Sequence, residues 1–273
     1  MQRYTWKTGI LEAVMILTAV VFFIPLYVLI VTALKEPNDP GGSLALPAKV
    51  TLQNFADAWN QGHLGNALGN SAIVTICSVV ILIVFSSLAA YPLARITKRW
   101  SKLAFIGFMI GLLLPFQLAL IPLYQTMRDL HLLGTVWALV LFYAGLQMPF
   151  SIFLYTGFLR ALPIEYEEAA AIDGAGLLTT FWRVLFPLLR PITGTVAILN
   201  VITIWNDFLT PLLYLSGSGQ QTVPVAIYAF VGQYVSQWNL VFAGLIISIF
   251  PILLVYFLLQ KTVIQGFASG LKG

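Results

Sequence analysis

A polar segment from Pro163 to Pro187 separates two long hydrophobic stretches of this sequence. Its charged residues are Glu165, Glu167, Glu168, Asp173 and Arg183. Four acids and a base close together can make ionic and hydrogen-bonded contacts, and the segment is too short to be a domain of its own. We therefore expect it to be a contact surface for another protein.

A second group of polar residues lies at the end of a hydrophobic stretch. Asp207 is the only acid in the predicted span 193–216, about 20 Å along a helix that starts near Thr193, at 1.5 Å per residue. A carboxylate there is costly unless it is paired or hydrated. One interpretation places Trp205, Asn206 and Asp207 on a solute pathway, where an aromatic ring stacks on sugar faces. The other, which we favour, makes Asn206 and Asp207 a helix break before Pro211.

Gln117 is a further candidate for contact with a solute. It is polar and lies in a hydrophobic stretch that also carries Pro115 and Pro122. It could hydrogen-bond a polar solute or a neighbouring helix. Both roles stay open.

The sequence indicates neither a metal site nor a catalytic site. His63 and His131 fall in loops without companion ligands, and the single cysteine, Cys77, lies in an apolar run. An enzyme acting within the membrane would need paired carboxylates, or a Ser/His or metal cluster. Because the sequence also has no GxxxxGK[ST] loop for ATP, we expect the chain to bind no cofactor and to be no enzyme.

The composition is that of a membrane protein. Of 273 residues, 59% are hydrophobic and 9% are charged, and the mean hydropathy is +0.91. An ordinary soluble domain has about a quarter of its residues charged. The net charge of +4 comes from basic residues in short loops beside hydrophobic stretches, which does not indicate a nucleic-acid partner.

Six hydrophobic stretches are long enough to cross the bilayer core, which takes about 20 residues of helix. They cover roughly residues 11–34, 70–93, 104–127, 135–158, 193–216 and 241–262. The first is too long for a signal peptide and lacks a small-residue cleavage site, so we expect it to be retained. The segment 216–239 is expected to be an outer loop that dips toward the bilayer or packs on the bundle.

The distribution of basic residues predicts the orientation of the spans. Eleven of the 14 lysines and arginines fall at the two termini and in the second and fourth loops, and three fall in the other loops. Cytoplasmic loops carry such an excess, so we expect both termini and the Pro163 to Pro187 segment in the cytoplasm. In the first outer loop, Thr51 is expected to cap a short helix along the membrane face.

Within the Pro163 to Pro187 segment the sequence predicts a helix, a turn and a second helix. Acids in the first turn suit the positive end of the helix dipole, and Gly174 can adopt the left-handed conformation that ends the helix. Asp173 could cap the second helix, whose apolar residues would pack under the bundle. These residues are Leu177, Leu178, Phe181, Trp182 and Leu185. A loop without any partner stays an alternative on these grounds alone.

Glu168-Ala169-Ala170, then Gly174, then Val184 to Pro187 resemble the EAA loop of ABC importer permeases, E-A-A-x3-G-x9-I-x-L-P. Other stretches are similar to the carbohydrate-type, maltose-permease-like branch of this family. They are Asn70-Ser71, Tyr91 to Arg95, Ile121 to Tyr124, Trp205 to Phe208 with Pro211-Leu212, and Gln260 to Gly273. The resemblance implies an all-α, six-helix type I importer permease. It would form one domain over 1–273, with a core at about 65–262, a coupling loop at about 160–191 and a tail at 263–273.

The resemblance further implies a permease subunit of an ATP-driven, binding-protein-dependent sugar or oligosaccharide importer in a prokaryotic inner membrane. The expected partners are a second permease, two ATPase subunits that hold ATP and Mg²⁺, and an extracytoplasmic solute-binding protein. The coupling contact with an ATPase would comprise Glu167, Glu168, Ala169, Ala170, Asp173 and Gly174. The alternative is a stand-alone secondary transporter or channel for a small polar solute. Ion coupling usually needs ionisable groups at the midplane, whereas Asp207 lies off-centre.

Overall fold

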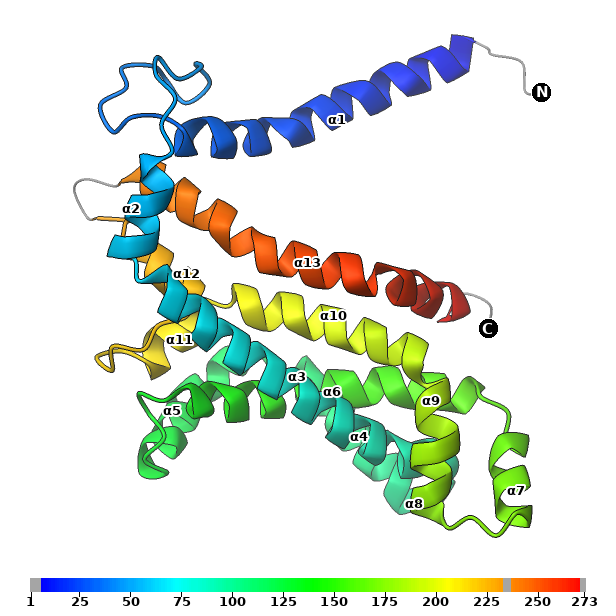
Figure 1. Ribbon diagram of the computed structural model, residues 1–273. Helices are drawn as coiled ribbons and strands as arrows, with labels where there is room; N and C mark the ends of the chain where they lie inside the picture. Colours follow the sequence, from blue (N-terminus) through cyan, green and yellow to red (C-terminus); the bar gives the residue numbers. More distant parts are fainter. Residues whose placement is uncertain (1–5, 233–236, 271–273) are drawn as a thin grey trace. The chain divides into compact units, whose positions relative to one another are not determined.

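The computed structural model describes residues 6–232 and 237–270, apart from the side chains of residues 7, 259 and 261–270. Arg3, Lys272 and the last three residues of the predicted tail lie outside the described residues. In the described part of the chain every regular element is a helix, and one isolated antiparallel bridge joins Lys35 and Val50 (Figure 1). The helices are α1 (Trp6–Ala33), α2 (Gln53–Gln61), α3 (Leu64–Arg95), α4 (Arg99–Leu113), η1 (Phe116–Ala119), α5 (Leu120–Asp129), α6 (Val136–Ala161), α7 (Glu165–Ile172), α8 (Leu177–Thr180), η2 (Phe181–Leu185), α9 (Phe186–Leu188), α10 (Arg190–Asn206), α11 (Leu209–Tyr214), α12 (Val223–Tyr228) and α13 (Trp238–Gly270).

Four of the described helices are long and apolar enough to cross a membrane by themselves, namely α1, α3, α6 and α13 as far as Leu258. Two bent pairs raise the number to six if each pair is one span. The pairs are Arg99–Leu113 with Phe116–Asp129, and Leu177–Leu188 with Arg190–Asn206. Five of the six predicted stretches therefore coincide with a long helix or a bent pair, whereas the fifth, 193–216, overlaps only the second half of its pair. The all-α fold class is confirmed.

The third predicted span, 104–127, is not the continuous helix that we expected. α4 ends at Leu113, a 3-10 turn follows from Phe116, and the two halves meet at 91°. Pro115 accounts for the break, because proline has no N–H to donate and forces the preceding residue out of the helical conformation. Leu114 is accordingly extended, with ψ 126°.

The fifth predicted span, 193–216, is also divided. α10 begins at Arg190, bent by 74° from the helices before it, and ends at Asn206. Asp207 is extended, with ψ 128°, and α11 starts only at Leu209. The interpretation of Asn206 and Asp207 as a helix break before Pro211 is thus confirmed.

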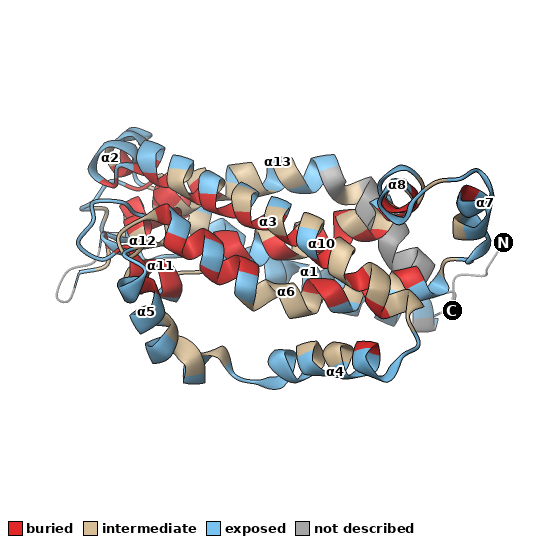
Figure 2. Ribbon diagram, turned by 90° about the horizontal axis from the view of Figure 1, so that it is seen from below, coloured by how far each residue is buried: buried red, intermediate tan, exposed pale blue. Residues whose placement is uncertain are grey.

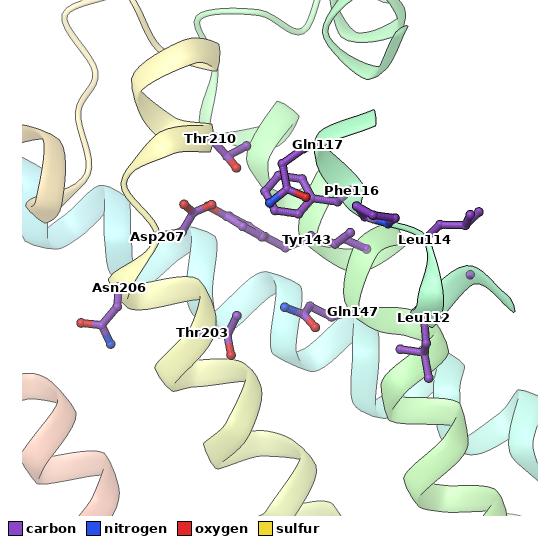
Figure 3. Close-up of a pocket in the computed structure, with 13 residues that line it drawn as sticks. Leu112, Leu114, Phe116, Gln117, Tyr143, Gln147, Thr203, Asn206, Asp207 and Thr210 are labelled. Carbon is purple, nitrogen blue, oxygen red and sulfur yellow. The ribbon is translucent and has the colours of Figure 1, made fainter. Parts of the chain in front are cut away.

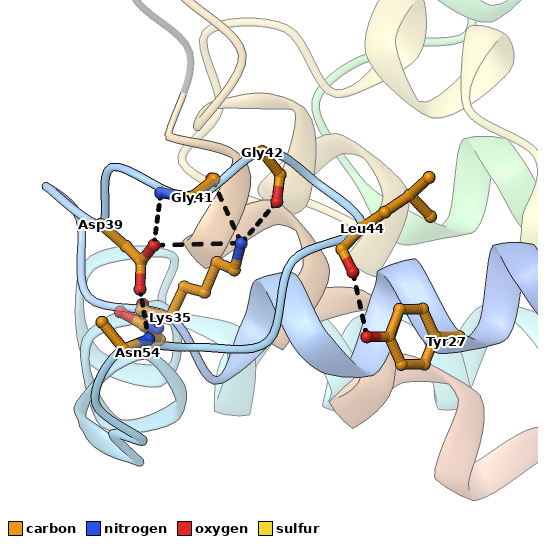
Figure 4. A network of polar contacts seen from close by, with 8 residues as sticks. Tyr27, Lys35, Asp39, Gly41, Gly42, Leu44 and Asn54 are labelled. Atoms are coloured by element: carbon orange, nitrogen blue, oxygen red, sulfur yellow. Dashed lines mark hydrogen bonds and ion pairs between the residues drawn. The ribbon is translucent and has the colours of Figure 1, made fainter.

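The chain divides into two compact units, which we describe separately, and the first comprises Met1–Gly65 and Val225–Phe250. In this unit Asn54 ties the end of α1 to α2, since its side-chain amide donates to the carbonyl oxygens of Ala33 (2.8 Å) and Lys35 (2.7 Å). The Lys35 ammonium is buried and donates to the carbonyl oxygens of Gly41 and Gly42 (Figure 4). These bonds give the 36–49 loop a defined conformation.

The same unit contains the predicted short helix of the first loop. α2 begins at Gln53 with Leu52, rather than the expected Thr51, at its N-cap position, and the Thr51 hydroxyl accepts the N–H of Gln53 at 3.1 Å. Asn239, in the first turn of α13, donates to the side-chain oxygen of Asn54 at 2.8 Å. Hydrogen bonds of the Asn54 and Asn239 amides therefore connect three segments of this unit.

The second unit comprises Asn66–Pro224 and Pro251–Gly273. Its core lies where the buried faces of α3, α6 and α10 meet, as Figure 2 shows. One cluster centres on Leu82, Leu139 and Tyr143. The other joins Tyr155 and Leu159 of α6 to residues of η2 and α10. Small polar residues complete the packing between helices, as in the hydrogen bond from Asn200 to the Ser151 hydroxyl (3.2 Å).

Two further expectations concern the loop at 216–239 and the tail. At the start of α3, Asn70 donates to the carbonyl oxygen of Gln221 (3.0 Å), and the Ser71 hydroxyl accepts the N–H of Val223 (2.9 Å). This part of the loop therefore packs on the bundle, as predicted. α13 continues to Gly270, so residues 263–270 extend the last helix rather than leaving it.

Candidate functional site

The helix–turn–helix predicted within Pro163 to Pro187 is present. α7 has three acids in its first turn and ends at Ile172. Gly174 follows with φ +77°, the left-handed conformation that glycine adopts at low cost, and Ala175 donates back to the carbonyl of Ala170 at 2.9 Å. Asp173 was predicted to cap the next helix but instead closes α7, because α8 starts only at Leu177 with Gly176 before it.

The predicted coupling residues do not all lie on one face of α7. Glu168, Ala169, Asp173 and Gly174 are exposed, whereas Ala170 is buried. Glu167 also points inward: its Oε1 accepts from Nε of Arg95 at 2.6 Å, and its Oε2 accepts from the Tyr91 hydroxyl at 2.9 Å. The placement of Glu167 on the outward contact face was wrong, since its carboxylate is taken up by α3.

The apolar residues of the second helix divide in a way that the sequence did not indicate. Phe181 and Leu185 are fully buried against α6 and α10, as predicted. Leu177 and Leu178 were expected beside them but are 76% and 70% exposed. Leu177 and Leu178 occupy the first turn of α8, directly after Gly176, and burial begins one turn later at Thr180 and Phe181.

Ile172 extends the exposed apolar surface at the end of α7. It is 87% exposed. Exposed apolar side chains therefore flank the Asp173–Gly176 turn in the sequence, with Ile172 before it and Leu177 and Leu178 after it. We call Ile172, Leu177 and Leu178 the apolar turn. Exposed apolar side chains gathered beside the acids of α7 are typical of a surface that binds another protein.

The second predicted site is a hollow of about 540 Å³ where α10 breaks. The Tyr143 hydroxyl donates to Oδ2 of Asp207 at 2.8 Å, and the N–H of Leu209 donates to Oδ1 at 3.1 Å. Asp207 therefore stabilises the break through one long-range contact and one local contact. Asn206 and Gln117 line the same hollow, but the Asn206 side chain is turned away from Tyr143 and Gln117 and its amide donates to the carbonyl oxygen of Ile202 at 2.8 Å (Figure 3).

Trp205 does not join them. It is buried, and it lines a different and apolar hollow of about 420 Å³ between α3, α10 and the second half of α13. Successive residues of a helix point about 100° apart, and here Trp205 and Asn206 line different hollows. The grouping of Trp205 with Asn206 and Asp207 was therefore wrong.

Sequence reasoning missed other polar residues of the Asp207 hollow. These residues are Tyr143, Gln147, Thr203 and Thr210. A signal was present, because Tyr143 and Gln147 are spaced i, i+4 in the fourth hydrophobic stretch and Thr203 and Asn206 are spaced i, i+3 in the fifth. Polar residues at this spacing share one helix face.

The histidines have a local role in the backbone. His63 and His131 have φ 47° and 57°, and each lies in the turn that follows a short helix, α2 and α5 respectively. Among the described residues, no three side chains of His, Cys, Asp or Glu come close enough to hold a metal ion.

Comparisons with known proteins extend over almost the whole chain. The sequence pattern of the family described as "Binding-protein-dependent transport system inner membrane component" matches residues 82–268. The melibiose/raffinose/stachyose import permease MelC of Bacillus subtilis is 36% identical over 268 residues, or 97% of each chain. The probable starch degradation products transport permease AmyC of Thermoanaerobacterium thermosulfurigenes is 36% identical over 256 residues, or 93% of each chain.

A further relative and a solved structure agree with these matches. The multiple sugar-binding transport permease MsmG of Streptococcus mutans is 34% identical over 273 residues, covering 98% of this chain and 96% of the relative. A chain of a bacterial ABC transporter involved in the import of the acidic polysaccharide alginate superposes with a TM-score of 0.83. Its sequence is 22% identical, and the match covers 96% of this chain and 99% of the other, so the two share a fold.

Proposed function

Since the chain belongs to the family of binding-protein-dependent transport system inner membrane components, multi-pass permease subunits of ABC importers, we propose that its solute is a sugar or oligosaccharide. The observation that carries this proposal is that relatives named for sugar import are 34–36% identical over more than nine tenths of the chain. The chain itself is a permease rather than an enzyme, and ATP hydrolysis belongs to separate subunits.

The assembled importer would contain four kinds of component around this chain. They are a second permease, more often a homologue than a copy, two ATPase subunits, a solute-binding protein and the lipid of a prokaryotic inner membrane. ATP and Mg²⁺ would be held by the ATPase subunits. The excess of basic residues at the termini and in the second and fourth loops supports termini that are cytoplasmic and an α7 that faces the ATPases.

The contact with an ATPase subunit would be made by the outer face of α7 and by the apolar turn. Glu168 offers a carboxylate that a basic residue of the ATPase can meet, and Ile172, Leu177 and Leu178 offer hydrocarbon that a groove can cover. Ala169 and Ala171 have small side chains, so the backbone of α7 can approach the groove of the ATPase closely. Closure of the two ATPases would then move α7 and open the bundle alternately to the two sides of the membrane.

The hollow at Asp207 would form part of the solute pathway. Its polar lining consists of amide, hydroxyl and carboxylate groups, which suit the hydroxyl groups of a sugar. The lining includes no lysine or arginine among the residues that the structure describes. Asp207 then has two functions at once, because its bond to Tyr143 fixes the break in α10 that opens the hollow.

Reconstitution in proteoliposomes tests this function. The full importer, its binding protein included, should take up labelled neutral oligosaccharides such as raffinose or maltose only when ATP is supplied inside. Omission of the ATPase subunits or of the binding protein should abolish uptake. Uptake by this chain alone, insensitive to ATP depletion, would instead support the stand-alone secondary transporter or channel.

A further inference from the structure

The last turn of α3 binds the start of α7 through a compact polar contact. Tyr91 and Arg95 lie one turn apart on α3, and both donate to the carboxylate of Glu167, at 2.9 Å and 2.6 Å. Nη2 of Arg95 also donates to the carbonyl oxygen of Leu162, at 3.1 Å, in the linker before α7. We call the set Tyr91, Arg95 and Glu167 the α3–α7 clamp.

A second arginine connects α6 to the same part of α3. Nη2 of Arg160, at the end of α6, donates to the carbonyl oxygen of Leu93 in α3 at 3.3 Å. The side chains of Arg95 and Glu167 are only 16% and 13% exposed. Since hydrogen-bonded charge pairs shielded from water are strong, and removal of one partner leaves the other uncompensated, the clamp is a firm connection.

α7 is a short helix between two irregular linkers. α7 has eight residues, all of them described, and Ala170 is the one that is buried. On its two sides lie the linkers 162–164 and 173–176, which are not regular helix. α7 also packs against η2 and α8, so Glu167 is its polar connection to α3, while Glu168 remains exposed.

α3 can carry a displacement from α7 over a long distance. It has 32 residues and is therefore about 48 Å long at 1.5 Å per residue. At its far end Asn70 and Ser71 hold the 221–223 segment by the two hydrogen bonds described above. One continuous helix thus makes polar contacts with α7 at one end and with a loop at the other.

We propose that the α3–α7 clamp transmits the movement of α7 to α3, so that Tyr91, Arg95 and Glu167 are positioning residues that couple ATP hydrolysis to transport. This inference rests on the proposed function of α7. Without the clamp, the linkers 162–164 and 173–176 would absorb the displacement of α7. ATP would then be hydrolysed with less movement of the bundle.

The test compares coupling in reconstituted, fully assembled importers that carry Glu167→Gln, Arg95→Gln or Tyr91→Phe. Three quantities are measured: the amount of ATPase that co-purifies, the basal rate of ATP hydrolysis, and the number of labelled solute molecules imported per ATP. We expect the ATPase to be retained and solute imported per ATP to fall about tenfold for the two charge-removing variants. Tyr91→Phe keeps the ring and the fold, and should lower the ratio by a smaller factor.

Charge reversal and a matched control complete the test. Arg95→Glu and Glu167→Arg alone should each uncouple the importer, and the double variant should recover part of the solute imported per ATP. Glu165→Gln removes an exposed acid from the same turn of α7 and should leave that ratio unchanged.

Two results would overturn the proposal. In the first, solute imported per ATP stays at the wild-type value in Glu167→Gln and in Tyr91→Phe. In the second, Glu167→Gln loses the ATPase in the manner expected of a residue in the ATPase contact. Both leave the proposed function intact, whereas failure of the wild-type importer to import with ATP would refute that function instead.

Discussion

Glu167 and Glu168 are adjacent in sequence but have opposite environments. Glu167 accepts hydrogen bonds from Arg95 and Tyr91 of α3, and the carboxylate of Glu168 is exposed. One acid therefore fixes the helix on its own chain, and the next is left to meet a partner. The predictions below follow from this division and from the two sites described above.

Changes at the exposed side of α7 should detach the ATPase. Glu168→Arg reverses the charge that a basic groove would meet. Gly174→Pro cannot keep the observed φ of +77°, because proline fixes φ near −65°. Both variants should lose most of the co-purifying ATPase in a pull-down from detergent-solubilised membranes. Glu165→Gln is the control, and ATPase recovery at the wild-type level in both altered chains would count against the proposed contact.

The apolar turn should matter for assembly and not for the stability of the chain. Ile172→Ser with Leu177→Ser changes side chains that are 87% and 76% exposed, so the isolated chain should unfold at nearly the same temperature while the recovery of ATPase falls severalfold. Phe181→Ala is the contrasting variant. Its ring is fully buried, and its loss should lower the free energy of unfolding by about 3–5 kcal/mol. A serine pair that destabilises the isolated chain as much as Phe181→Ala would disprove the assignment.

Cysteine accessibility should distinguish the two hollows of the second unit. In a Cys77→Ser background, Gln147→Cys and Asn206→Cys should react with a water-soluble thiol reagent, and excess solute should slow the reaction in the assembled importer. Trp205→Cys faces the apolar hollow and should react at least about tenfold more slowly. Equal rates at positions 205 and 206 would contradict the separation of the hollows.

The 36–49 loop should respond to acid through Asp39. Backbone N–H groups of Ala48 and Gly41 donate to its carboxylate, and together with the Lys35 charge they hold the pKa of Asp39 below its usual value. A carboxyl with a lowered folded-state pKa stabilises the fold at any pH above its unfolded value of about 3.9, and that contribution is lost as the pH falls through the folded value. Limited proteolysis of the loop should therefore be constant from about pH 5 to 8 and faster below about pH 4. In Asp39→Asn this acid-dependent increase should disappear.

Much of the fold follows from local patterns in the sequence. Runs of apolar residues locate the spans, and Gly174 marks the end of α7 because only a glycine takes that conformation cheaply. The breaks in the third and fifth stretches were harder to place. Pro115 breaks a helix visibly, but its consequence of a 91° bend depends on how α4 and α5 pack.

Local sequence patterns could not predict the contacts between residues that are distant in the chain. Nothing near Glu167 indicates that it faces Tyr91 and Arg95, which lie 72 or more residues earlier in the chain. The π-helical turn at Phe181–Leu185 leaves no clear sequence signal either, nor does the exposure of Leu177 and Leu178 one turn before the buried Phe181. Side-chain direction at both places is set by tertiary packing rather than by residue type.

Site-specific cross-linking tests the central claim most directly. A chain with Ile172→Cys in the Cys77→Ser background is labelled at this cysteine with a photoreactive, thiol-linked probe. It is then assembled with its ATPase subunits. The account predicts a cross-link to an ATPase subunit, with a yield that changes when ATP is bound and hydrolysed. Normal ATP-driven uptake without any such cross-link, or labelling of this cysteine by an impermeant reagent from outside the cell, would contradict it.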